Sequence, residues 1–353
     1  MKPGLSLTEL AAKIEANRSL KRDYIADTRD MRMLVQDDGA TALEFPDGTA
    51  GGARATFPVL STAHDQIGDR TGIPAKYYDR MLAEDPALLA TNVNAWFARK
   101  PARRMVRTLG GDARALLSDR YQRVDNEHIA EVALPVLAEL PGVQFPSCEV
   151  TDRRLYIHFV VPTITGEVKK GDVVQAGGII SNSEVGHGSV SVAGLIWRLW
   201  CLNGAKTGEA FRRNHVGRQV EDSEALWADD TRAADDRAVL LKVRDMVRAV
   251  VDETRFRATL AKMQGLVAPR ITGSPERAVE VLAHNIGATQ GERESILRAL
   301  IEGADLSAWG LVNAVTAQAH AAASYDRAVE FEAAGGALID LPATEWREVL
   351  EAA

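Results

Sequence analysis

The sequence has few cysteines, no long apolar run and none of the short motifs that mark common catalytic sites. Its only two cysteines, Cys148 and Cys201, are too few for a disulfide framework, so we expect free, buried thiols. No window reaches the roughly 18 uninterrupted apolar residues of a membrane-spanning helix, so we expect no membrane partner. Residues 1–24 form an amphipathic pattern without the apolar core of a signal peptide, which favours the cytoplasm.

Motifs for metals, nucleotides and nucleophilic catalysis are also missing. No Cys-x-x-Cys or His-x-x-x-His pair is present, although His158, His187, Cys201 and His215 are scattered along the chain, so we expect no metal. There is no Gly-x-Ser-x-Gly, no phosphate-binding Gly-x-x-x-x-Gly-Lys-Ser/Thr loop and no Gly-x-Gly-x-x-Gly after a strand. These absences predict no cofactor and favour a protein that is not an enzyme.

The apolar periodicity predicts an α+β protein. Residues 1–30 have the spacing of a single helix with a lead-in, and helical spacing returns from residue 221 onwards. Residues 143–199 predict four or five strands in meander order, two of which meet at Gly177. We therefore expect an antiparallel meander sheet with flanking helices, followed by a C-terminal helical domain.

Changes of pattern divide the chain into three expected domains. Residues 1–58 are predicted to form an N-terminal helix and short strands. Residues 59–220 are predicted to form an α+β body around the central antiparallel sheet. Residues 221–353 are predicted to be the helical domain, because breaks at glycines separate segments with three-to-four-residue apolar spacing.

The charge is unevenly distributed. A net charge of −7 argues against a strongly basic nucleic-acid-binding protein. Residues 99–123 nevertheless hold eight cations against two acids, and residues 221–236 hold seven anions against Arg232. Local patches of opposite sign can steer a polyanion even when the total charge is negative.

The first basic stretch is a candidate phosphate-binding surface with aromatic residues nearby for base stacking. Strand alternation would send Arg103, Met105 and Arg107 to one face and Arg104 to the other. The alternative is a solvated sheet face beside a core tryptophan. The candidate contacts to phosphate are Arg99, Lys100, Arg103, Arg104, Arg107, Arg120 and Arg123, and the candidate stacking residues are Trp96, Tyr121 and Trp200.

A second basic cluster follows the turn expected at Asn203-Gly204 and holds Arg212, Arg213, His215 and Arg218. Neighbouring cations repel one another, so this cluster needs a counter-anion. Either an external phosphate or the acidic residues 221–236 could supply it. Tyr121, Asn203, Arg212 and His215 are also the reactive types from which an uncommon catalytic site could be built.

Several segments resemble a known family. Residues 116–126 (LLSDRYQRVDN), 198–217 (RLWCLNGAKTGEAFRRNHVG) and 308–335, supported by residues 72–82 and 94–96, resemble the phage/plasmid-like proteins that carry domain of unknown function 932. The resemblance covers roughly residues 60–335. It implies an origin on mobile elements and a role in DNA transactions, and it implies no catalytic residues.

Together, these patterns favour a mobile-element protein that binds or anneals single-stranded DNA during recombination or replication. By analogy with phage annealing proteins, we expect a homo-oligomer in which several subunits line one groove with cations. One alternative is a protein-interaction factor, such as an inhibitor of host defence, whose acidic face imitates nucleic acid. The second alternative is an enzyme of unknown reaction.

Overall fold

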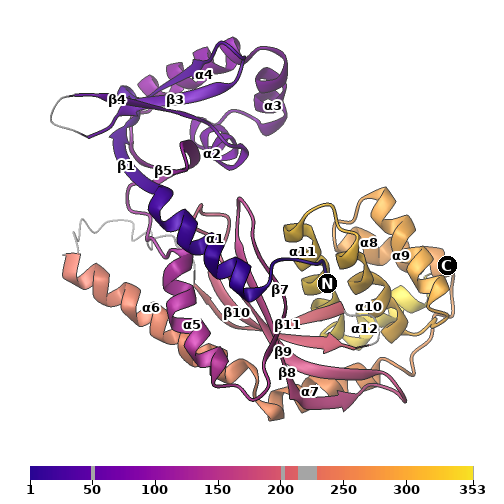
Figure 1. The fold of residues 1–353 in the computed structure, drawn as a ribbon. Helices are drawn as coiled ribbons and strands as arrows, with labels where there is room; N and C mark the ends of the chain where they lie inside the picture. Colours follow the sequence, from indigo (N-terminus) through magenta and orange to yellow (C-terminus); the bar gives the residue numbers. More distant parts are fainter. Residues whose placement is uncertain (49–51, 200–202, 214–228, 353) are drawn as a thin grey trace.

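The computed structural model describes residues 1–48, 52–199, 203–213 and 229–352 (Figure 1). About 49% of the chain is helical and 26% lies in strands, and the named strands pair only in antiparallel fashion. The predicted α+β class is therefore confirmed. The elements form a larger lobe around a five-stranded sheet and a smaller lobe with two three-stranded sheets.

The larger lobe is built on a meander in which each strand pairs with its sequence neighbour. The order β11-β10-β9-β8-β7 confirms the predicted meander. The strands are β7 (Gln144–Val150), β8 (Leu155–Glu167), β9 (Val173–Asn182), β10 (Val190–Arg198) and β11 (Asn203–Arg213).

Two of these strands differ from the expectation. The two strands predicted to meet at Gly177 are one strand, β9. A Cβ on Gly177 would lie 2.2 Å from the carbonyl oxygen of Phe159, so glycine here permits a close approach between strands instead of a turn. Asn203 and Gly204, expected to form a turn, are instead the first residues of the edge strand β11, which pairs with β10.

Three helices cover one face of this sheet: α1 (Leu7–Leu20), α5 (Asn126–Ala138) and α6 (Asp229–Val250) (Figure 1). Their apolar sides and the strands share one buried cluster. Each large aliphatic side chain buried in it contributes about 1.5–3 kcal/mol. Members of the cluster include Leu10, Ile129, Phe159, Ile180 and Val243.

The C-terminal part is helical, as predicted, and after α6 it reaches the other face of the sheet, where Tyr325 and Val329 pack against Ile179. Its helices are α7 (Glu253–Gly265), α8 (Pro275–Asn285), α9 (Gln290–Glu302), α10 (Ala308–Ala317), α11 (Tyr325–Ile339) and α12 (Ala343–Leu350). The buried indole of Trp309 donates to Asp172 Oδ2 at 2.8 Å, and Arg198 binds the same carboxylate. Because these contacts and a shared apolar cluster join helices to strands, this part is a layer on the sheet.

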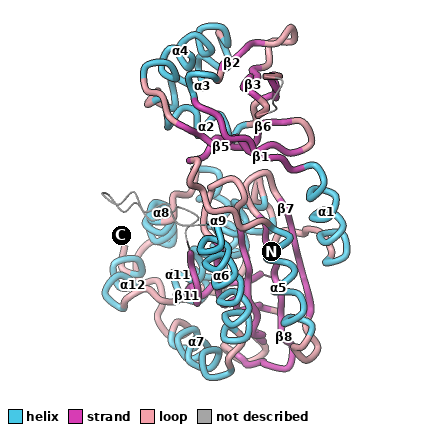
Figure 2. Tube along the Cα trace, turned by 90° about the vertical axis from the view of Figure 1, so that its left-hand side faces the viewer, coloured by secondary structure: helices cyan, strands magenta, loops and turns pink. Residues whose placement is uncertain are grey.

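The smaller lobe combines two sheets with three helices. One sheet consists of β1 (Lys21–Asp27), β5 (Arg103–Leu109) and β6 (Asp112–Ser118), in the order β1-β5-β6. The other consists of β2 (Arg32–Val35), β3 (Thr41–Pro46) and β4 (Arg54–Pro58). The helices are α2 (Ser61–Thr71), α3 (Ala75–Glu84) and α4 (Pro86–Arg99). In Figure 2, β1, β5 and β6 lie on the side of the smaller lobe that faces the larger lobe.

The single helix expected over residues 1–30 ends at Leu20, and that expectation is wrong beyond this point. Residues Lys21–Asp27 form β1, in which Tyr24 lies opposite Val106 of β5. Aromatic and β-branched residues such as Tyr24 and Ile25 suit a strand, but Val106, the partner of Tyr24, is 82 residues away in the sequence. As a result, residues 1–58 contribute α1 to the larger lobe and β1–β4 to the smaller one.

A buried ion cluster joins the two lobes at the loop between β9 and β10. The carboxylate of Glu184 in this loop accepts hydrogen bonds from Arg114 Nη1 of β6 at 2.7 Å, from Lys21 Nζ of β1 and from the backbone N–H of Asn126 at 2.7 Å. Burial by itself raises the pKa of Glu184, but Arg114 and Lys21 outweigh it and hold the pKa below its ordinary value.

Arg107 of β5 forms the second half of this cluster. Its guanidinium donates to Asp23 at 2.8 Å, to Asp125 at 2.7 Å and to the carbonyl oxygen of Glu184 at 2.8 Å. Its side chain is only 1% exposed. Arg107 thus links β1 and β5 of the smaller lobe to Asp125 and Glu184 of the larger lobe, and the opposite charges compensate one another.

We predict that Glu184→Gln destabilises the protein by about 3–5 kcal/mol, because it leaves Arg114 buried without a matching negative charge and leaves Lys21 with Glu127 alone. Urea unfolding followed by circular dichroism measures this change. The control is Glu84→Gln, whose carboxylate is exposed and pairs with Arg80 on one helix, and which should cost less than about 1 kcal/mol. Equal unfolding midpoints for the two variants would contradict a stabilising role for the cluster.

Candidate nucleic-acid interface

Four of the predicted basic residues lie together where α4 passes into β5. Helix α4 ends at Arg99, and β5 begins at Arg103 after a connection of three residues that contains Pro101. Arg99 lies in the last helical turn and Lys100 is the C-cap, where positive charge is favoured by the helix dipole. This corner therefore concentrates charge for a local structural reason.

The Trp96 ring contacts two cations at the end of α4, Arg99 and Lys100. The Lys100 ammonium lies 5.1 Å from the centre of the Trp96 ring, and the Arg99 guanidinium lies 5.6 Å from it. Both distances are within the range of cation–π attraction. Trp96 itself is half-buried against the core of the smaller lobe, so part of its surface stays accessible.

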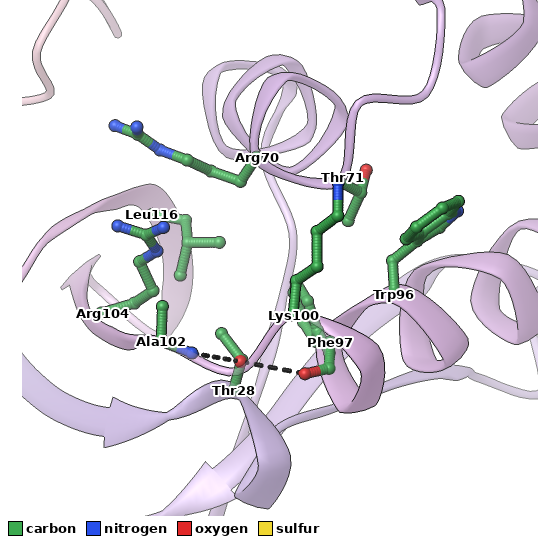
Figure 3. Close-up of a pocket in the computed structure, with 9 residues that line it drawn as sticks. All are labelled: Thr28, Arg70, Thr71, Trp96, Phe97, Lys100, Ala102, Arg104 and Leu116. Carbon is green, nitrogen blue, oxygen red and sulfur yellow. Dashed lines mark hydrogen bonds between the residues drawn. The ribbon is translucent and has the colours of Figure 1, made fainter.

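The fold adds Arg70, a cation that the sequence analysis did not select. Arg70 lies in the last turn of α2 and lines a recess together with Lys100 and Arg104. Figure 3 shows the guanidinium groups of Arg70 and Arg104 on the same side of the recess, with Lys100 and Trp96 on the other. Only the packing of α2 against β6 brings Arg70 here, and no local sequence signal could have identified it.

We call this set of charges the cationic corner. Arg70, Arg99, Lys100 and Arg104 lie around Trp96, and the exposed Arg103 and Arg120 belong to the chain segments that adjoin Arg104. Arg120 is included because it follows Ser118, which lies opposite Arg104 in the sheet.

The cationic corner has acidic residues nearby, Asp27 beside Arg103 and Asp119 beside Arg104, but no ion pair within the described part of the chain. None of its six cations forms an ion pair with a carboxylate of the described residues. Asp27 lies opposite Arg103, but its carboxylate is bound by Arg29 at 2.9 and 3.0 Å. Partial burial, followed by repulsion from Arg70, lowers the pKa of Arg104, and nearby Asp119 opposes this only in part.

Three other predicted contacts do not belong to this surface. Arg107 is buried in the ion cluster between the lobes, so it cannot reach a phosphate. Met105, two residues before Arg107 and on the same face of β5, packs towards the larger lobe, whereas Val106 packs into the smaller one, as strand alternation requires. Arg123 is 56% exposed, but its guanidinium is 3.2 Å from Asp23.

Tyr121 is anchored in the same junction. Its hydroxyl donates to the carbonyl oxygen of Ser183 at 3.0 Å, and its ring packs against a buried cluster that includes Val185. Burial raises the pKa of Tyr121 well above its ordinary value. These contacts hold the Tyr121 ring in the junction between the lobes, so the ring is not available to stack on a base.

The second basic cluster lies only partly within the described residues. The backbone of Arg212 and Arg213 closes β11 opposite Ser191 and Val190 of β10. The side chains of Arg212 and Arg213, together with His215, Arg218, Trp200 and the acidic residues 221–228, lie outside the described parts. At the end of the acidic stretch, Gln122 Nε2 donates to Asp235 at 3.0 Å and to Asp236 at 2.5 Å.

A chain of reactive side chains in the larger lobe has a structural role. His158 Nε2 lies 2.9 Å from Glu332 Oε2, and His158 Nδ1 lies 3.1 Å from the hydroxyl of Tyr325, which contacts Ser147 at 2.7 Å. His158 and Glu332 are fully buried, so no substrate can reach them. The chain connects α11 with β7 and β8.

Within the described ranges, no group of three or more His, Cys, Asp or Glu side chains could hold a metal ion. No helix there is long and apolar enough to span a membrane. Comparison of the chain with protein-family models, curated proteins and solved structures finds no match. Function therefore has to be inferred from the geometry of the cationic corner.

His64 is another histidine that serves the core. Its Nε2 lies 2.9 Å from Thr41 Oγ1 and its Nδ1 lies 2.8 Å from the Tyr78 hydroxyl, so it joins α2 to β3 and α3. Burial lowers the pKa of His64 to about 4. Between pH 6.5 and 4 the unfolded chain therefore takes up a proton that the folded protein excludes.

We predict that His64 makes the protein lose up to about 3 kcal/mol of stability as the pH falls from 6.5 towards 4. The stability is fully present above pH 6.5, because both states then hold a neutral imidazole. Urea unfolding at several pH values should show a shallower pH dependence for His64→Gln than for the wild type. His128→Gln, which changes an exposed histidine, is the control, and an equally shallow profile for it would contradict the assignment.

Proposed function

We propose that the protein binds single-stranded nucleic acid through the cationic corner. The observation that carries this proposal is a group of four cations around the half-buried Trp96, with two more in adjoining segments, none of them in an ion pair within the described residues, in a protein whose net charge is −7. Cations gathered in this way repel one another unless an anion lies among them. In an otherwise acidic protein, such a local exception indicates a binding site for an anionic ligand.

The arrangement suits a single strand better than a duplex. A ring such as Trp96 can stack on a base only when that base is unpaired and exposed, whereas cations around it follow the backbone phosphates. Arg99 and Lys100 lie over the ring, and Arg104 of β5 lines the adjoining recess together with Arg70. One base and its neighbouring phosphates could therefore be held at one corner.

The proposal includes a role in the recombination or replication of mobile-element DNA in the cytoplasm, which is the expectation drawn from the resemblance to the phage/plasmid-like family. One cationic corner per chain can contact only a short part of a long strand. The proposal therefore includes a homo-oligomer, in which cationic corners of several subunits follow one another along the strand and support annealing. No reaction is proposed, because the reactive side chains that the fold assembles around His158 and His64 are buried.

We predict that replacing Lys100, Arg103 and Arg104 together by glutamine weakens binding to an oligonucleotide and flattens its salt dependence. Each lost phosphate contact lowers the slope of log K against log salt by about 0.7 for a single strand, so the slope should fall by about 2. Fluorescence anisotropy with a labelled oligonucleotide measures both quantities.

The matched control replaces three exposed arginines that are paired with carboxylates, Arg80, Arg257 and Arg277. It changes the net charge by the same amount but should leave the slope almost unchanged. Absence of binding by the wild type at low salt, or equal slopes for the two triple variants, would refute the cationic corner as the interface.

We also predict that Trp96→Leu weakens binding by about 1–3 kcal/mol, the contribution of one stacked base. Trp96→Phe should retain most of the affinity, because it keeps an aromatic ring at the same place. The same anisotropy titration measures both variants, and circular dichroism checks that they fold. Equal losses for leucine and phenylalanine would argue against stacking.

A further inference from the structure

Two cations already lie over the Trp96 ring at the cationic corner. The Lys100 ammonium lies 5.1 Å and the Arg99 guanidinium 5.6 Å from the centre of the ring. Within the described part of the chain, neither side chain has an ion pair or a hydrogen bond to another group. The ring is therefore the group with which both cations interact in this fold.

The helix that carries these side chains is held in place, while the two cations are exposed. The side-chain amide of Asn94 accepts a hydrogen bond from the backbone N–H of Met33 at 2.8 Å and donates one to the carbonyl oxygen of the same residue at 2.9 Å. Trp96 packs against the core of the smaller lobe. Arg99 and Lys100 are exposed at the end of the helix. The two cations can therefore leave the ring without any movement of α4.

A base can stack on the accessible part of Trp96 only where a cation gives way. Cation–π attraction and base stacking are of the same order, and stacking is the stronger of the two at an exposed ring. An uncharged aromatic ligand that displaces a cation gains stacking but loses the cation–π contact, so its net gain is small. The same exchange is favourable for a nucleotide within a strand, because its phosphates receive the displaced cation.

We infer that Arg99 and Lys100 determine the specificity of the Trp96 stacking site, because they release the ring only to a base that carries neighbouring phosphates. The site accepts a nucleotide of a strand and disfavours uncharged aromatic ligands. This inference rests on the proposed function, since it concerns the same ring and the same strand. It adds that the stacked base and the phosphate contacts are coupled through these two side chains.

The test uses two labelled single strands of one sequence, a natural phosphodiester strand and an uncharged strand with methylphosphonate linkages. Both strands offer the same bases, but only the first offers anionic phosphates. The double variant Arg99→Gln, Lys100→Gln uncovers the ring and removes two cations. It should bind the uncharged strand about two- to fivefold more tightly than the wild type does, the factor that corresponds to the loss of one competing cation–π contact.

The same variant should bind the phosphodiester strand more weakly. Its salt slope should fall by about 1.4, since two phosphate contacts at about 0.7 each are lost. Opposite changes for the two strands distinguish a role in specificity from a general role in charge attraction or in folding. Fluorescence anisotropy measures both affinities, and circular dichroism checks the fold of the variant.

The matched control is Arg103→Gln, Arg120→Gln, which removes two exposed cations of the corner that do not lie over Trp96. It should weaken binding of the phosphodiester strand and leave the affinity for the uncharged strand unchanged. Adding Trp96→Leu to the Arg99→Gln, Lys100→Gln variant should abolish the gain for the uncharged strand, because the ring is then absent.

The inference is overturned if the Arg99→Gln, Lys100→Gln variant binds the uncharged strand no more tightly than the wild type does, or does not bind it detectably. A gain that persists after Trp96→Leu would also overturn it. Binding of the phosphodiester strand by the wild type tests the proposed function separately. Absence of that binding overturns the proposed function, whereas normal binding without the gain leaves the proposed function standing and overturns only the specificity.

Discussion

The arrangement of the two lobes depends on the neutralisation of one buried carboxylate, that of Glu184. Lys21 of β1 and Arg114 of β6 approach it from the smaller lobe, and the backbone of Asn126 approaches it from the start of α5. A buried charge is tolerated only when its partners are in place. The position of the β1-β5-β6 sheet relative to the larger lobe is therefore coupled to the ionisation of this side chain.

This constraint also determines what β5 presents to the solvent. With Arg107 held inward by Asp23 and Asp125, the strand alternation turns Arg104 to the other face, towards the ends of α2 and α4. One strand thus supplies a structural cation and a candidate ligand-binding cation. Their difference lies in their partners, since carboxylates surround Arg107 and another arginine lies beside Arg104.

Parts of the fold could be predicted because they depend on local patterns. The meander over β7–β10 follows from apolar strands separated by turns, and the C-terminal helices follow from spacing and from caps such as Ser274 and Ser307. The sequence pattern does not predict β1, because its partner β5 is distant in the sequence. β9 was divided in two because Gly177 was interpreted as a break, although it permits close contact with Phe159.

The basic stretch of residues 99–123 illustrates the same division for the candidate site. The sequence by itself determined that cations and aromatic residues are concentrated there, since composition and spacing are properties of the chain. Only the tertiary structure decided which of them face the solvent. It buried Arg107, anchored Tyr121, paired Arg123 with Asp23 and brought Arg70 from α2 to Arg104. The physical reason is that the energy of a charged group depends on its neighbours in space, and these neighbours come from distant parts of the sequence.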